Sequence, residues 1–311
     1  MQPPKSVSLA SAEQAHQRAS SGISAGLPAG EAVRRLVDRF GPRLHALALR
    51  MCGNAADAED MVQEVFLQAL RKWHTFRGDA DPGTWLHAIA ARSCKARLRR
   101  KGGVNRRVPA MSQLMPWAET SVMAVAAAAE DRADAAERNE AVARVQRAIA
   151  GLPEHLRVPL VLKEVLAMSV DDVAEALGLG VNTVKTRLFR ARLALRKAMI
   201  AKAAAVAAPA PIYERQVCLD LLKAKMEAMN RGGTAGGFKV PQAELCARCR
   251  AVFRELDLVQ DACAQLGMGR MSAAVRAKLL RAIAAREQKE RERTSKSRPG
   301  RRPVRGRTGD R

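Results

Sequence analysis

The chain has 311 residues and a formal charge of +23, because 54 lysines and arginines outnumber 31 aspartates and glutamates. Such an excess favours a polyanionic partner, since each neutralised phosphate releases condensed counterions; arginine usage in a GC-rich genome and a basic tail are the alternative source. Aromatic residues make up only 3% of the chain, which argues against a single-strand binder with many stacking platforms. No stretch of 18 apolar residues occurs, and the first residues lack an apolar segment, so we expect neither a membrane span nor a secretory signal.

Alanine and leucine dominate and strand-like alternation is scarce, so the predicted fold is all-α. We expect two helical domains joined by a linker and followed by a small helical C-terminal domain. Changes in composition and the prolines near 210 set the boundaries. The predicted segments are a disordered N-terminus 1–29, a helical domain 30–102, a linker 103–138, a second helical domain 139–204, a cysteine-containing domain 212–285 and a disordered basic tail 286–311.

The stretch DAEDMVQEVFLQALRKWHTFRG, which begins at Asp57, predicts an amphipathic helix. Its inward stripe at helical spacing is Val62, Val65, Phe66, Ala69 and Trp73. Its outer face is acidic and polar and consists of Asp57, Glu59, Asp60, Gln63 and Glu64. Taken alone, this face fits a solvated helix start, where carboxylates interact favourably with the helix dipole.

The next stretch, DADPGTWLHAIAARSCKARLRRK, predicts a loop at Pro82 and Gly83 and a helix that Trp85 opens. Eight lysines and arginines and no acid lie between Arg92 and Arg107. A surface that faces phosphates explains such one-sided charge better than a solvated helix does. Trp85 taken alone fits a core position.

The stretch LPEHLRVPLVLKEVLAMSVDDVAEALGLGVNTVKTRLFRARLALRKAM predicts a helix-turn-helix. Ser169 with Asp172 resembles a capping box, Gly178 and Gly180 flank the turn, and Asn182 can cap the second helix. Val184, Leu188 and Ala191 face inward from that helix. The side chains left to point outward are Lys185, Thr186, Arg187, Phe189 and Arg190. Such donors suit major-groove and phosphate contacts, although an ordinary helical hairpin is the alternative.

Together and in this order, these stretches resemble a bacterial sigma factor of the extracytoplasmic-function group of the sigma-70 family. The resemblance covers about residues 31–101 and 139–200. The acidic helix and the basic helix after it are similar to the region that docks on core RNA polymerase and melts the −10 element. The helix-turn-helix is similar to the region that reads the −35 element. The loop GDADPGTWL is less regular than the family's loop, which leaves the −10 base preference open.

The resemblance implies partners and site residues. The β′ coiled coil of core polymerase would be bound by Asp57, Asp60, Gln63 and Glu64. The −10 element would be contacted by Arg77, Trp85, Arg92, Lys95, Arg99 and Arg100. The −35 element would be contacted by Lys185, Thr186, Arg187, Phe189 and Arg190. The β flap of the polymerase and a separate anti-sigma factor are further expected partners.

The chain continues past this family's usual end and carries four more cysteines. Cys218 begins one amphipathic stretch, and Cys246 and Cys249 open another, ELCARCRAVFRELDLVQDAC. This pattern resembles a zinc-binding anti-sigma domain, but the histidine that the family places four residues before the first cysteine of the pair is here Gln242. The candidate ligands are Cys218, Cys246, Cys249 and Cys263.

Thiolates favour zinc or Cu(I), so a metal site is the leading prediction for these cysteines; a thiol redox switch or purely structural cysteines are the alternatives. If one helix runs on from Cys249, Cys263 lies about 21 Å along it and joins the set only if the helix breaks or another chain contributes. Cys52 and Cys94 fit buried packing positions.

We therefore predict a cytoplasmic sigma factor with a fused metal- or redox-responsive domain, which acts by binding rather than by catalysis. The alternative is a helix-turn-helix transcription regulator that acts without polymerase docking. An enzyme finds little support, because the sequence offers no phosphate loop, no nucleophile–base pair at recognisable spacing and no histidine-rich metal site.

Overall fold

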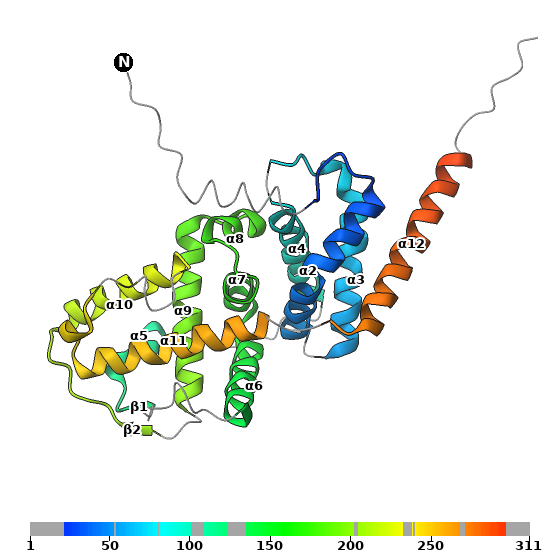
Figure 1. Ribbon diagram of the computed structural model, residues 1–311. Helices are drawn as coiled ribbons and strands as arrows, with labels where there is room; N and C mark the ends of the chain where they lie inside the picture. Colours follow the sequence, from blue (N-terminus) through cyan, green and yellow to red (C-terminus); the bar gives the residue numbers. More distant parts are fainter. Residues whose placement is uncertain are drawn as a thin grey trace, which may run out of the picture.

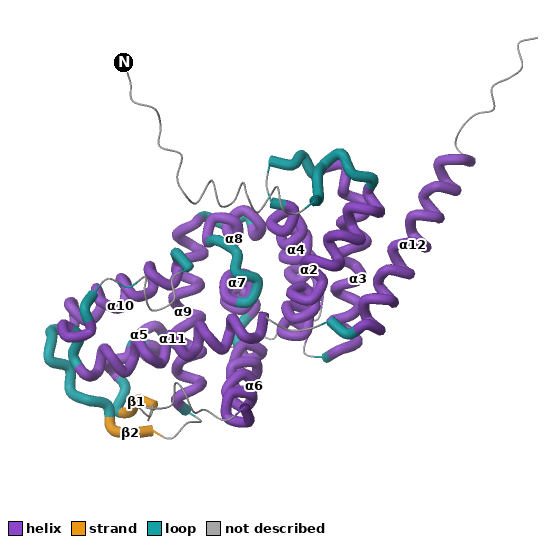
Figure 2. The backbone as a smooth tube through the Cα atoms, in the orientation of Figure 1, coloured by secondary structure: helices purple, strands orange, loops and turns teal. Residues whose placement is uncertain are grey.

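The computed structural model describes residues 22–52, 54–79, 81–100, 109–123, 135–201, 205–232, 238, 240–267 and 271–296. These residues are almost entirely helical, which confirms the predicted all-α class (Figure 2). None of the described helices combines the length and the apolarity that a membrane crossing needs.

The first helical domain consists of α2 (Ala29–Cys52), α3 (Ala55–Lys72) and α4 (Pro82–Arg100), with a short 3-10 helix at Trp73–Thr75. The predicted inward stripe of α3 is buried, and Trp73 is only 4% exposed. Asn54 caps α3, because its side-chain oxygen accepts a hydrogen bond from the Asp57 backbone N–H at 2.8 Å. The long apolar stripes of α2 and α3 face each other, so these two helices pack side by side.

The second helical domain consists of α6 (Ala135–Gly151), α7 (Glu154–Glu164), α8 (Val170–Leu177) and α9 (Val181–Ile200). The linker before it contains α5 (Met111–Leu114), a 3-10 helix at Pro116–Ala118 and β1 (Ser121–Met123). The all-α prediction did not include β1, which pairs antiparallel with β2 (Ala205–Ala207) and places Val122 opposite Val206.

The C-terminal helices are α10 (Arg215–Asn230), α11 (Ala247–Gly267) and α12 (Ala273–Lys296), with a 3-10 helix at Gln242–Glu244. The prediction of a disordered tail from residue 286 is wrong as far as Lys296, because α12 is helical to that point. The rest of the tail, 297–311, and the N-terminal segment 1–21 lie outside the described residues.

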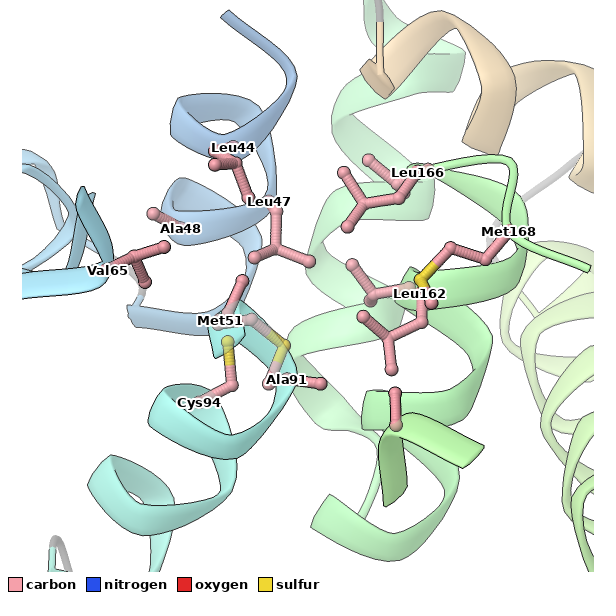
Figure 3. Packing of buried hydrophobic residues seen from close by; sticks show 14 of the residues in the cluster. Leu44, Leu47, Ala48, Met51, Val65, Ala91, Cys94, Leu162, Leu166 and Met168 are labelled. Atoms are coloured by element: carbon pink, nitrogen blue, oxygen red, sulfur yellow. The ribbon is translucent and has the colours of Figure 1, made fainter. Parts of the chain in front are cut away.

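One continuous apolar cluster runs through both helical domains. Figure 3 shows Leu47 and Met51 of α2 lying opposite Leu162 and Leu166, which belong to α7 and the turn after it. Helix α4 packs against α7 and α8, so the predicted boundary between the two domains carries a buried interface. A second cluster joins the linker, Leu193 of α9, α10 and the first half of α11.

Helix α11 connects the two clusters. It crosses α9, α7 and α6 (Figure 1), with Phe253 in the second cluster and Cys263 and Leu266 in the first. At its end, Gly267 approaches α7 closely: a Cβ there would lie 2.3 Å from the Val165 carbonyl oxygen. Only glycine therefore permits this packing, which directs the chain from the second domain towards the first.

Two buried arginines of α9 hold the C-terminal helices against the second domain. The Arg192 guanidinium donates to Glu164 of α7 at 2.6 Å and to the Asn230 side chain at 2.7 Å. The Arg196 guanidinium donates to Glu255 of α11 at 2.6 Å and to Glu119 of the linker at 2.5 Å. Since both arginines are at most 1% exposed, each depends on these carboxylates for its charge balance.

We predict that Arg196→Ala lowers the free energy of unfolding by about 3–5 kcal/mol, because it breaks the buried ion pair between Arg196 and Glu255 by removing one partner. Urea unfolding followed by circular dichroism measures the change. The control is Lys223→Ala, which breaks an exposed ion pair with Asp220 on α10 and should change stability far less, because exposed ion pairs are screened by solvent. Equal losses in the two variants would contradict a structural role for the buried pair.

Candidate nucleic-acid interface

The helix-turn-helix forms as predicted at its first helix and turn. The Ser169 hydroxyl accepts a hydrogen bond from the Asp172 N–H at 3.0 Å and caps α8. Gly178 ends α8 in the left-handed region with φ of 64°, and the N–H groups of Gly178 and Leu179 bond back to carbonyls of α8. These bonds form a Schellman motif, which only glycine adopts without strain at this position.

One capping prediction is wrong. Asn182 does not cap α9, because the helix begins one residue earlier, at Val181, and Gly180 occupies the capping position without a side-chain hydrogen bond. Asn182 lies inside the first turn, where its carbonyl accepts from the Thr186 hydroxyl at 2.9 Å.

The outward residues of α9 divide into two groups. Thr186 is exposed, and Arg187 and Arg190 are half-buried beside His155 at the start of α7. Burial and the two guanidinium charges together lower the pKa of His155. Thr186, Arg187 and Arg190 present hydroxyl and guanidinium donors on one side of α9.

Lys185 and Phe189 lie on the other side of α9, which faces the C-terminal helices. The Lys185 ammonium pairs with Glu227 of α10 at 3.2 Å. The Phe189 ring packs against the second apolar cluster. Two of the five predicted −35 contacts are therefore engaged within the chain.

Some of the cationic side chains of the basic helix α4 are exposed to solvent. Arg92 and Lys95 are exposed, as is Arg77 in the loop before the helix. Arg97 instead pairs with Asp57 of α3 at 2.5 Å and ties α4 to α3. The side chains of Arg99 and Arg100 lie outside the part of the chain that the structure describes.

Trp85 belongs to an aromatic cluster at the base of this loop. Its ring lies edge-on to Trp73 and tilted against Phe76, with both centroid distances at 5.6 Å. The Trp73 indole N–H donates to the Leu27 carbonyl oxygen at 2.9 Å, which fixes the cluster to the segment before α2. Trp85 is half-buried, and one side of its ring packs against the first apolar cluster.

The acidic face of α3 is polar and accessible in part. Asp60 and Glu64 are exposed and Gln63 is half-buried. Glu64 pairs with Arg71 of the same helix at 3.0 Å, and Asp57 is occupied by Asn54 and Arg97. The interaction that the sequence did not predict involves a neighbouring carboxylate: Glu59 pairs with a lysine of α12, Lys278, at 2.9 Å.

Three of the four candidate metal-binding thiols lie together in the C-terminal helices. Cys218, Cys246 and Cys249 are buried, and the Cys249 thiol interacts with both of the others. A cavity of about 20 Å³ beside Cys218 and Cys249 has room for about one water molecule. Among the described residues, however, no group of three or more His, Cys, Asp or Glu side chains is arranged to hold a metal ion.

The prediction that Cys263 joins this set is wrong. Helix α11 is unbroken from Ala247 to Gly267, so Cys263 lies about 21 Å along it from Cys249. Cys263 is fully buried in the first cluster near Glu164 and Arg192, and burial raises the pKa of its thiol. It packs as a small apolar side chain.

The protonation of the cysteine pair is asymmetric. Burial opposes ionisation of Cys246, but hydrogen bonds from the backbone at Cys249, Ile212 and Arg248 outweigh it and lower the pKa of the thiol. Burial and the neighbouring Cys246 and Cys218 raise the pKa of Cys249 to about 12. Of the pair, Cys246 therefore loses its proton at lower pH than Cys249 does, and it is the more reactive thiol.

The sequence reasoning missed the buried arginines of α9. A signal was present, because Arg192 and Arg196 continue the stripe of Lys185 and Phe189 at helical spacing. Glu255 likewise interrupts the apolar stripe of α11. A charged residue inside each of two apolar stripes predicts a buried ion pair between the helices that carry them.

Comparison with protein families finds two matches in this chain. The Sigma-70 region 2 model matches residues 36–104, which include α3, α4 and most of α2. The Sigma-70 region 4 model matches residues 143–195, which include the helix-turn-helix. Residues after 195 are matched by neither model.

Individual relatives cover the same part of the chain. The RNA polymerase sigma-H factor of Pseudomonas aeruginosa is 36% identical over 165 residues, which are 53% of this chain and 84% of that protein. The ECF RNA polymerase sigma factor SigW of Bacillus subtilis is 31% identical over 170 residues, 54% of this chain and 88% of that protein. The solved sigma factor RpoE of Bartonella quintana, in complex with the anti-sigma factor NepR, has a TM-score of 0.38 at 23% identity and covers 52% of this chain and 93% of its own.

We predict that a maleimide labels Cys246 before Cys249 at pH 7–8. The lowered pKa keeps Cys246 ionised to lower pH, whereas Cys249, with a pKa of about 12, stays protonated and unreactive in this range. Tandem mass spectrometry of the labelled full chain distinguishes the two sites. Labelling of Cys249 at an equal or faster rate would contradict the asymmetry.

Proposed function

The chain belongs to the extracytoplasmic-function group of the sigma-70 family, and from this premise we propose that it binds core RNA polymerase and directs it to promoters. The observation that carries the proposal is the presence of both matched regions in one chain and in this order. A helix-turn-helix regulator that acts without polymerase would have no need for the first region.

The polymerase contact in this proposal is the outer face of α3. Asp60 and Glu64 offer exposed carboxylates, Gln63 adds an amide, and Asp57 fixes the start of the helix through Arg97. Acidic side chains on a rigid helix suit a basic partner surface, which here is the β′ coiled coil. The β flap contact belongs to the helix-turn-helix domain, as the family resemblance implies.

The promoter contacts divide between α4 and α9. The −10 element is bound by the exposed cations Arg77, Arg92 and Lys95, beside the aromatic cluster of Trp85. The −35 element is read by α9, whose Thr186, Arg187 and Arg190 present donors for phosphates and base edges. The protein acts by binding, without catalysis, and it works in the cytoplasm, where both partners are found.

The C-terminal helices form a regulatory module in this proposal. They pack directly on α9, where Arg192 donates to Asn230 of α10 and Arg196 pairs with Glu255 of α11, so a change in the module reaches the DNA-reading helix. The cluster of Cys218, Cys246 and Cys249 makes the module responsive to metal or redox state. Zinc or copper thiolate binding would require the sulfurs to move together, since they are not arranged as a metal site here. A separate anti-sigma factor is a further partner.

We predict that Asp60→Lys with Glu64→Lys weakens binding to core RNA polymerase about tenfold or more, because like charges then face each other across the interface. Binding of the full chain to purified core enzyme is measured by fluorescence anisotropy. The control is Asp220→Lys, which changes an exposed carboxylate of α10. Absence of core binding by the unchanged protein would refute the sigma function.

We predict that Arg187→Ala weakens promoter binding of the assembled holoenzyme by about 1–3 kcal/mol, as expected for loss of one donor to a base or phosphate. Salt titrations distinguish a base contact from a phosphate contact. Loss of a phosphate contact lowers the slope of log affinity against log salt concentration by about one, whereas loss of a base contact leaves this slope unchanged. Lys223→Ala, which removes an exposed cation from α10, is the control and should leave affinity and slope unchanged.

We predict that the chain purified under reducing conditions contains about one zinc or copper ion if metal is the signal. Elemental analysis of the full chain and of a Cys246→Ser/Cys249→Ser variant measures it. Cys52→Ser, which changes a cysteine of α2 outside the cluster, is the control and should retain the metal. Metal-free protein after reconstitution would eliminate metal sensing and leave thiol oxidation to be tested.

A further inference from the structure

Helix α12 lies alongside α3 and α2, away from the rest of the C-terminal module (Figure 1). Five residues, 268–272, separate it from α11, of which the structure describes Met271 and Ser272; α11 ends at Gly267 and α12 begins at Ala273. Because α11 ends beside α7 and α2, this short connection places α12 on the first helical domain. The chain thus returns from its C-terminus to the helix that carries the predicted polymerase contact.

The contact between α12 and the first domain has an apolar centre. Leu279 and Ile283 are spaced four residues apart on one face of α12 and are 3% and 0% exposed. Both belong to the same cluster as the buried residues of α2 and α3. Burial of two branched side chains stabilises the docked helix, so its position does not depend on surface charge alone.

Ion pairs surround this centre. Lys278 pairs with Glu59 of α3 at 2.9 Å and lies near Asp60. Arg276 pairs with Asp38 of α2 at 2.5 Å. Farther along, Glu287 pairs with Arg34. The Glu287 side chain reaches α2 by passing over Gly30, where a Cβ on residue 30 would collide with the Glu287 carboxylate.

The charge of α12 is complementary to the face that it covers. From Ala273 to Arg286 the helix carries four cations and no carboxylate. One of them, Lys278, lies over the acidic start of α3, where the polymerase contact of Asp57, Asp60, Gln63 and Glu64 is placed, and another, Arg276, lies over α2. The docked helix thus pairs with Glu59, directly beside the carboxylates that a basic polymerase surface would bind, and its Lys278 lies near one of them, Asp60.

We propose that α12 is an intramolecular competitor of core RNA polymerase for the acidic face of α3. The inference rests on the proposed sigma function and adds to it the segment that regulates docking. While α12 is docked, the polymerase meets a partly neutralised surface, and its apparent affinity is reduced by the fraction of molecules in which α12 is released. Any event in the C-terminal module that loosens α11 would raise that fraction.

The test compares full-length chains for affinity to purified core RNA polymerase. The first variant, Arg276→Glu with Lys278→Glu, turns two attractions into repulsions and should tighten binding about tenfold. The second, Ile283→Ala, changes no charge and should tighten binding by a similar factor, because it removes an apolar anchor. The control is Arg281→Glu, an exposed cation of α12 that makes no ion pair with the described residues.

Tighter binding by the charge-reversed chain and unchanged binding by the control is the expected result. Equal affinities of all chains would overturn the competition and leave the sigma function intact. A gain shared by the Arg281→Glu control would also overturn it, because the effect would then come from net charge. If no chain binds core polymerase, the proposed function itself fails. Should Ile283→Ala fail to fold, the charge-reversed variant still decides the question.

Discussion

The buried arginines of α9 are the constraint on which the rest of the structure depends. A guanidinium without water or a counterion is strongly destabilising, so Arg192 and Arg196 require carboxylates in fixed positions. Glu164 comes from α7, Glu119 from the linker and Glu255 from α11. The second domain, the linker and the C-terminal module are therefore joined through one helix. A chain that ended after α9 would leave Arg196 without its most buried partner.

This constraint determines where the C-terminal module can lie. With Glu255 fixed on Arg196, the remainder of α11 runs across α7 and α6 towards the first domain. Gly267 then allows the helix end to approach the Val165 carbonyl, and α12 reaches α3. The same packing places Glu227 on Lys185 at the DNA-reading helix. Helices α10, α11 and α12 thus bring the C-terminal module into contact with both surfaces that a sigma factor uses.

Local signals predicted more of this molecule than nonlocal ones. The Ser169 cap and the Gly178 turn depend on neighbours in sequence, and both were predicted correctly. The pairing of β1 with β2 joins strands far apart in the chain. Each strand has only three residues, which is too short for an alternating pattern that would predict it. The position of Cys263 depended on whether α11 is continuous. The helix is unbroken from Ala247 to Gly267, so Cys263 lies far from Cys249. The docking of α12 was not predicted, because Leu279 and Ile283 are buried by α2 and α3, which precede them by more than 200 residues.

The most direct test of the account is amide hydrogen exchange of the full chain, alone and with core RNA polymerase. Residues 55–72 of α3 and 273–296 of α12 are compared between the two samples. If polymerase displaces α12 from α3, the amides of α12 lose protection when polymerase binds, while those of α3 keep or gain protection. Unchanged protection of α12 in the complex would contradict the account, because the two partners would then occupy different faces of the first domain.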